Sequence, residues 1–163
     1  MQNRRYPIDE DIALQRRIWR FERVGWYLMI TVVVLTLCGL FSHGVFSATT
    51  VTSAQKDLVV EYERFHRNGA VNTMVTQSHG APRTQQTLII GSAMMQGFSV
   101  DSMQPQPISS AGSRQGLRLT LPTDDQGDST LYLAWRSQGP GFYNSDVAIE
   151  GGGRVPVSQF VYP

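Results

Sequence analysis

Hydrophobic and polar positions divide this chain into an uncharged apolar stretch and a longer part with short alternating segments. Residues 24–55 contain no Asp, Glu, Lys or Arg, and the most apolar run extends from Trp26 to Phe41. A helix that crosses a bilayer needs about 20 mostly apolar residues, and Trp and Tyr concentrate at the bilayer boundary. We therefore predict a single transmembrane α-helix over residues 26–47, with Trp26 and Tyr27 at one interface.

The first 25 residues have the pattern of an amphipathic helical stem. Asp9 can cap a helix start, and neither Pro nor Gly follows before Gly25. Trp19 and Phe21 can dip into the acyl boundary of the bilayer or dock on the cytoplasmic face of a larger membrane protein, and both interpretations stay open. The cations expected at lipid headgroups are Arg16, Arg17, Arg20 and Arg23.

Basic residues on the two sides of the apolar stretch predict its orientation. Four arginines precede it closely, whereas the first basic residue after it is Lys56. The positive-inside rule places such an N-terminus in the cytoplasm. The preference for Arg over Lys and the lack of an Asn-x-Ser/Thr sequon fit a bacterial inner membrane with a periplasmic C-terminal domain. A cleaved signal peptide ending before Ala48 is the alternative, but its basic region would be unusually long and partly acidic.

The remainder of the chain alternates with the period of β-strands. After a linker over residues 48–56, residues 57–163 are expected to form an all-β domain with about eight strands. The predicted strands are 58–66, 71–77, 87–90, 97–103, 116–121, 129–135, 145–149 and 155–162. This spacing predicts an antiparallel β-sandwich of immunoglobulin-like architecture, although the Cys and Trp signature of true immunoglobulin domains is missing. Pro156 predicts an edge position or a bulge because proline cannot donate to a strand ladder.

Composition narrows the function classes. Cys38 is the only cysteine and lies in the apolar stretch, so the chain forms no internal disulfide and no multi-cysteine metal site. The basic excess belongs to the N-terminal segment, and the β region has no basic stripe, which argues against nucleic-acid binding.

Candidate chemistry is sparse. His66 and His79 flank a predicted hairpin and could approach each other to form a soft copper site with Met74, Met94, Met95 or Met103, but no pair has diagnostic spacing. The acidic run of residues 124–128 lacks the distal Glu of a calcium loop and fits a turn. Glu61 and Glu63 share one strand face and fit solvated side chains. We therefore expect no catalytic, cofactor-binding or metal-binding residues and no enzyme activity.

The remaining candidates are contact residues. A helix-packing face could include Gly25, Thr31, Thr36 and Gly39, whose small or hydroxylated side chains permit close approach. A predicted loop over residues 137–144 presents Phe142 and Tyr143 either as binding anchors or as lids over the core.

Together these features predict an accessory or assembly subunit of a larger bacterial inner-membrane complex. Its partners would be the lipid bilayer and a multi-span membrane protein, and homo-oligomers stay open. The alternative is a membrane-anchored periplasmic ligand-binding module or sensor, and a copper-handling accessory is a third hypothesis.

Overall fold

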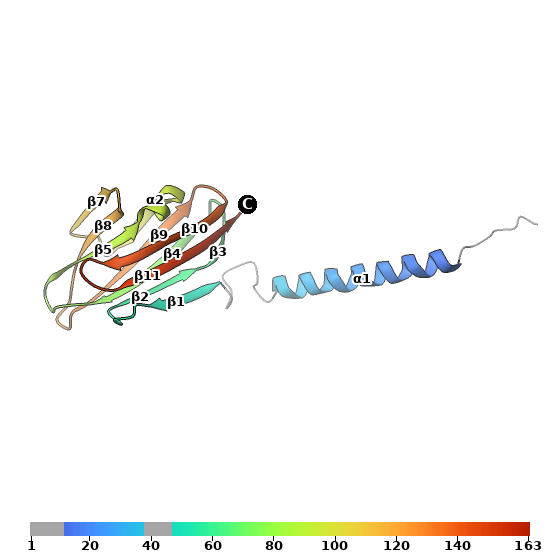
Figure 1. Cartoon of the computed structure of the whole chain (residues 1–163), viewed down its shortest axis with the longest axis horizontal. Helices are drawn as coiled ribbons and strands as arrows, with labels where there is room; N and C mark the ends of the chain where they lie inside the picture. The colour runs from blue at the N-terminus through green and yellow to red at the C-terminus, as the bar shows by residue number, and fades with distance from the viewer. Residues whose placement is uncertain (1–11, 38–46) are drawn as a thin grey trace, which may run out of the picture. The chain divides into compact units, whose positions relative to one another are not determined.

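The computed structural model describes residues 12–37 and 47–163, and the chain divides into two compact units over residues 1–38 and 39–163. The first unit contains helix α1, Ile12–Leu37 (Figure 1). Residues 12–25 of the predicted stem and the first part of the predicted span, residues 26–37, therefore form one continuous helix. The predicted helix start near Asp9 lies outside the described residues.

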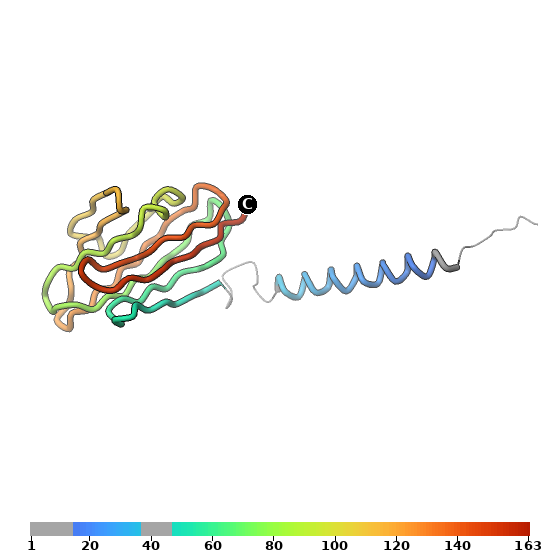
Figure 2. Tube along the Cα trace, in the orientation of Figure 1, coloured from blue at the N-terminus to red at the C-terminus, as the bar shows by residue number. Residues whose placement is uncertain are grey.

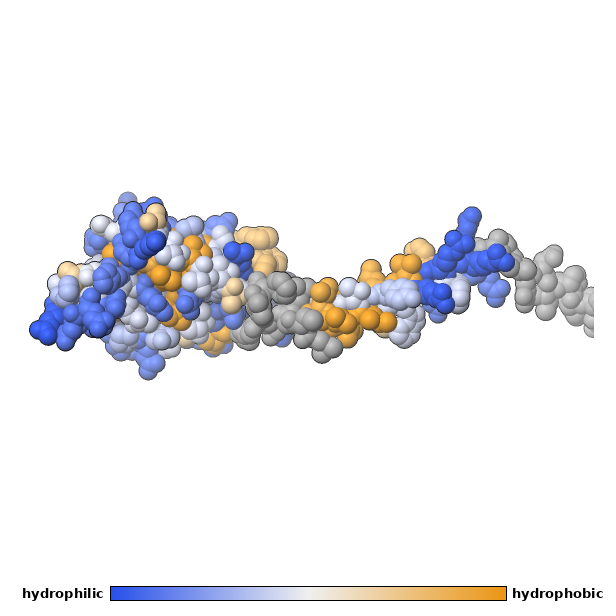
Figure 3. Space-filling view, turned by 90° about the horizontal axis from the view of Figure 1, so that it is seen from below, coloured by the Kyte–Doolittle hydropathy of each residue, from blue (hydrophilic) through white to orange (hydrophobic). Residues whose placement is uncertain are grey.

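Helix α1 changes character along its length, from hydrophilic at its N-terminal end to hydrophobic at its C-terminal end (Figure 3). Its charged residues end at Arg23, so the uncharged part of the helix, residues 24–37, is shorter than the about 20 residues of a typical span. Within the described residues, no helix combines the length and the apolarity needed to cross a membrane. The predicted span over residues 26–47 is therefore not supported, and residues 38–46 of it lie outside the described residues.

The second unit is an all-β sandwich of two sheets, which confirms the predicted fold class at this level (Figures 1 and 2). One sheet has the order β1-β2-β4-β9-β6, and the other has the order β3-β11-β10-β5-β8-β7. A short helix, α2, spans Ser92–Gly97. The strands are β1 Ala48–Thr52, β2 Leu58–Glu63, β3 Phe65–Arg67, β4 Val71–His79, β5 Gln85–Gly91, β6 Phe98–Gln104, β7 Ser109–Ser113, β8 Gly116–Pro122, β9 Asp128–Ser137, β10 Gly141–Ile149 and β11 Arg154–Tyr162.

Alternating side chains from both sheets fill the core between them. In β4, β9 and β11 buried and more exposed residues alternate along nearly the whole strand, as expected when one face of a sheet is covered. Trp135 is the largest fully buried side chain and packs on Phe98, with ring centroids 4.9 Å apart. The folded unit is thus held by apolar packing, in agreement with the lack of cysteines in this region.

Several boundaries differ from the prediction. Residues 48–52 form strand β1, which pairs antiparallel with β2, so the predicted linker is wrong over its first half. The predicted loop over residues 137–144 lies outside the strands only at residues 138–140, because residues 141–144 begin β10. The predicted first strand is split into β2 and β3. One pair, β3 with β11, is parallel, so the sandwich is not purely antiparallel. The immunoglobulin-like assignment stays a prediction.

Candidate functional site

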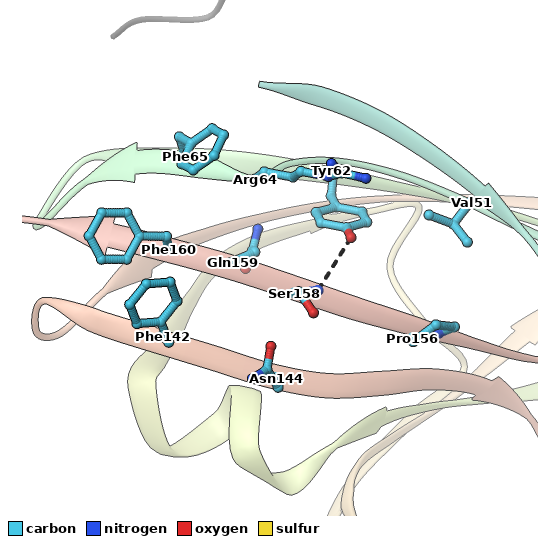
Figure 4. Close-up of a pocket in the computed structure, with 10 residues that line it drawn as sticks. All are labelled: Val51, Tyr62, Arg64, Phe65, Phe142, Asn144, Pro156, Ser158, Gln159 and Phe160. Atoms are coloured by element: carbon cyan, nitrogen blue, oxygen red, sulfur yellow. Dashed lines mark hydrogen bonds between the residues drawn. The ribbon is translucent and has the colours of Figure 1, made fainter. Parts of the chain in front are cut away.

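Three phenylalanines lie side by side on the outer face of the second sheet, and we call Phe65, Phe160 and Phe142 the three-phenylalanine row (Figure 4). They stand on adjacent strands, because Phe65 of β3 pairs with Phe160 of β11, which pairs with Phe142 of β10. Ring centroids are 6.5 Å apart for Phe65 and Phe160 and 4.4 Å apart for Phe160 and Phe142. Phe65 is 44% exposed and Phe142 is 78% exposed, so the row presents aromatic surface on the outside of the sandwich.

Strand alternation explains why the row points outward. In β11, Val157, Gln159 and Val161 are buried, so the neighbouring positions, Ser158 and Phe160 among them, face the other side. Successive side chains of a strand point to opposite faces of its sheet. An aromatic residue at an outward position of each of three neighbouring strands therefore builds a continuous patch.

A groove with a volume of about 390 Å³ runs along this row. Its apolar wall includes the row and Val51 of β1, and its polar groups come from Arg64, Asn144 and Ser158. Such a mixture of aromatic surface with a few polar groups is typical of binding sites. The arrangement can accept apolar groups and can pair a negative charge with Arg64, and we see no reactive pair of side chains along it.

The strand edge in this groove is closed to further strand pairing. Strand β3 pairs only with residues 160–162 of β11, so Pro156 and Ser158 lie beyond its end. Pro156 has no amide hydrogen to leave unpaired, and the Ser158 amide donates to the Tyr62 hydroxyl at 3.2 Å (Figure 4). The predicted edge position of Pro156 is confirmed, and the groove is suited to side chains or small groups.

The row lies at the end of the sandwich where the chain enters it. The Ser47 hydroxyl donates to the Phe65 carbonyl at 3.0 Å, and the Arg64 amide donates to the Ser47 carbonyl at 2.8 Å. Strand β10 begins and β11 ends at this same end. We call it the entry end, defined by Ser47 and the three-phenylalanine row.

A buried polar cluster lies behind the row. His66 is 5% exposed, and its Nδ1 lies 2.8 Å from Asn72 Nδ2, which also donates to Glu63 Oε2 at 3.3 Å. Gln159 is buried as well and donates from Nε2 to the Glu63 carbonyl at 3.0 Å. Burial lowers the pKa of His66, opposed in part by the Glu63 carboxylate. His66 is therefore held neutral, which suits an imidazole that accepts the Asn72 hydrogen.

The structure separates the two aromatic residues that the sequence placed together. The Tyr143 ring packs edge-on against Phe98 in the core, and its hydroxyl donates to the Gly139 carbonyl at 3.0 Å. Tyr143 thus covers the core, and of the two residues only Phe142 is exposed, so its role as a binding anchor stays a prediction. Sequence reasoning missed Phe65 and Phe160, because their meeting depends on the parallel pairing of β3 with β11.

In helix α1 every side chain from residue 15 to residue 36 is exposed, including those of the four predicted headgroup arginines Arg16, Arg17, Arg20 and Arg23. The guanidinium carbon of Arg23 lies 4.1 Å from the centroid of the Trp19 ring, a cation–π contact. Phe21 is 85% exposed, which leaves it free for either predicted role.

The predicted small-residue face is only partly a single face. At 3.6 residues per turn Gly25 and Thr36 lie nearly in line, whereas Thr31 lies about a third of a turn away. The hydroxyls of Thr31 and Thr36 donate to the Tyr27 and Val32 carbonyls at 2.8 and 2.7 Å. Gly39 lies outside the described residues.

The predicted approach of the two histidines is wrong. His66 lies at the entry end, whereas His79 ends β4 at the opposite end, where its Nδ1 is 2.7 Å from Asp128 Oδ1. Within the described residues, no group of three His, Cys, Asp or Glu side chains could hold a metal ion. The Asp124 carboxylate accepts from the amides of Gln126 and Asp128, both at 2.8 Å, which lowers its pKa and accounts for the acidic run as a turn.

Comparisons with known proteins give little further information. No protein-family model and no curated protein matches the chain. Among solved structures, the cupredoxin domain of amoB from Nitrosocaldus yellowstonii is similar at 15% identity, with a TM-score of 0.29, over 66% of this chain and 57% of that chain. A TM-score this low supports no inference about a ligand or an activity.

Proposed function

We propose that the protein is an accessory or assembly subunit of a larger complex in a bacterial inner membrane and acts through contacts of helix α1 and the sandwich. The observation that carries the proposal is the exposure of α1, in which Ile18, Trp19 and Phe21 are all more than half exposed. Large exposed apolar surface marks a site of contact with a protein or a membrane. A multi-span partner would cover the apolar half of the helix and face its arginine-rich half.

The lack of charged side chains over residues 24–47, ahead of the sandwich, supports a membrane setting for this contact. The threonine hydroxyls of α1 are satisfied by carbonyls of their own helix, so they can enter apolar surroundings without an unpaired donor. Gly25 and Thr36 share a face that permits close helix packing. In this proposal the N-terminus is cytoplasmic and the sandwich is periplasmic.

The test is purification of the full chain through an N-terminal tag in mild detergent, followed by native mass spectrometry. We expect a stoichiometric multi-span membrane protein. Thr36→Leu should lower its recovery, whereas Thr31→Leu, a matched change on another side of the helix, should not. Equal recovery with both variants would argue against the assigned helix face.

Recovery of monomer or homodimer alone would overturn the subunit proposal and favour the ligand-binding alternative, which the groove of about 390 Å³ also supports.

A further inference from the structure

We propose that the entry end of the sandwich rests on an anionic lipid surface, with the three-phenylalanine row at the boundary between headgroups and acyl chains. The inference relies on the proposed membrane setting but not on the identity of a protein partner. In this proposal the row contacts lipid. Contact of the row with a protein or with a second copy of the chain would contradict it.

Charge distribution over the sandwich favours this orientation. At the entry end Arg64 and Arg67 are exposed and form no ion pair among the described residues. Arg136 lies at the same end and pairs with Asp101, and Glu63 is tied to the buried cluster. At the opposite end the ion pairs Arg83–Asp125, Arg118–Glu150 and Arg154–Asp146 cancel. Lys56 is then left with three acids, Asp57, Asp124 and Asp128. An anionic surface therefore attracts the entry end and repels the opposite one.

The side chains of the entry end match the chemistry of a lipid interface. Surfaces that lie on a bilayer combine Lys or Arg with large apolar residues that enter the acyl boundary. Phe65 and Phe142 supply exposed apolar surface, and Arg64 and Arg67 flank Phe65 in the sequence. A peptide strand is a poor alternative occupant because Pro156 and the Tyr62 hydroxyl close the strand edge beside the row.

Chain connectivity supplies an independent argument. Residues 24–47 carry no charged side chain and lead directly into the entry end, where Ser47 bonds to Arg64 and Phe65. If that stretch is embedded in or bound to a membrane, the first part of the sandwich to meet the surface is the row.

The experiment compares two labelled positions in the full chain, each in a Cys38→Ser background. Asn68→Cys places an environment-sensitive fluorophore in the exposed turn at the entry end, and Gln126→Cys is the matched control in an exposed turn at the opposite end. The protein is incorporated at about one copy per vesicle into phosphatidylcholine with or without phosphatidylglycerol. Nitroxide-labelled lipid headgroups then quench any fluorophore that lies at the surface.

We expect strong quenching at position 68 that requires phosphatidylglycerol, and weak quenching at position 126. Replacing Arg64 and Arg67 with Gln should lower the ratio of docked to undocked protein about 25-fold, at about fivefold per arginine. Replacing Phe65 and Phe142 with Ser should also abolish the difference between the positions.

Four results would overturn the inference. Equal quenching at both positions, or quenching independent of lipid charge, would remove the assigned orientation. Quenching that appears only with several copies per vesicle would assign the row to a second copy. Failure of the full chain to float with vesicles would overturn the membrane setting as well. Failure to co-purify a protein partner would leave the lipid inference standing, so the two proposals fail separately.

Discussion

Replacing Phe142 with alanine separates a contact role of the row from a role in folding. The side chain is 78% exposed, so only about a fifth of it is buried. Full burial of such a residue stabilises by roughly 1.5 to 3 kcal/mol, so truncation should cost about 0.5 kcal/mol from lost burial. Loss of the ring contact with Phe160 adds about 0.5 to 1.5 kcal/mol. We expect a total near 1.5 kcal/mol. Phe98→Ala is the comparison, because Phe98 is 3% exposed and should cost about 3 to 5 kcal/mol.

Thermal unfolding of the full chain in detergent, followed by the circular dichroism of the β-sheets, measures this difference. For a domain of this size about 1 kcal/mol shifts the Tm by roughly 4 °C. Phe142→Ala should therefore lower the Tm by about 6 °C and abolish most of the quenching at position 68, while Phe98→Ala should lower the Tm by more than about 12 °C. If Phe142→Ala destabilised the sandwich as much as Phe98→Ala, the row would be a structural element, and the contact role would lose its basis.

Three further predictions concern residues close to the row. The pKa of His66 is lowered in the folded chain, so the unfolded chain binds this proton more tightly. The free energy of unfolding is therefore highest above about pH 6.5, the ordinary pKa of the group. Below that pH it falls by at most about 1.4 kcal/mol per pH unit until the pKa of the folded state is reached. His66→Gln should flatten urea unfolding free energies between about pH 7 and 5, and an unchanged slope would contradict this assignment. Tyr62→Phe removes the acceptor of the Ser158 amide, but water in the groove can replace it. The free energy of urea unfolding should therefore fall by about 1 kcal/mol. A fall of more than about 3 kcal/mol would mean that water does not reach the amide. Gly97→Ala places a methyl group against the Tyr143 ring and should destabilise by about 1 to 3 kcal/mol in the same assay, whereas an unchanged stability would show that the ring moves freely.

Strand content was predictable because alternation is a local property of the sequence. Each of the eight predicted strands overlaps a strand of the structure, and residues 71–77 lie within β4. Strand β1 was not predicted because the Thr-rich residues 48–52 are partly exposed at a sheet edge and show little hydrophobic alternation. The predicted strand over residues 145–149 was shorter than β10 because Gly141 and Asn144 are residue types common in turns. Both nevertheless lie in a long ladder with β11. Edge pairing and ladder length depend on distant strands, so a local pattern cannot specify them.

The apolar stretch is the opposite case, because its hydropathy predicted a longer membrane helix than the described residues support. Residues 26–47 were predicted as one span. Of these, residues 26–37 belong to helix α1, and Ala48, one position beyond the predicted span, begins strand β1. Hydropathy alone does not mark that change, because Val and Thr on both sides of it are compatible with either state. The position of the helix end therefore has to come from the fold that follows.

The three-phenylalanine row illustrates why a contact site of this kind is hidden in a sequence. Phe65 and Phe160 are 95 positions apart and become neighbours only through the parallel pair β3 and β11, whereas Phe142 was visible because it sits near Gly and Pro. The same pairing stops after three residues, and this early end exposes the edge that Pro156 and Tyr62 then close. A short strand β3 thus creates both the aromatic surface and the groove beside it. Because Ser47 bonds to that same strand segment, the surface is fixed to the point where the chain enters the sandwich. A change that lengthened the β3 pairing would cover the groove without moving the aromatic rings, and it would show whether groove or rings carry the contact.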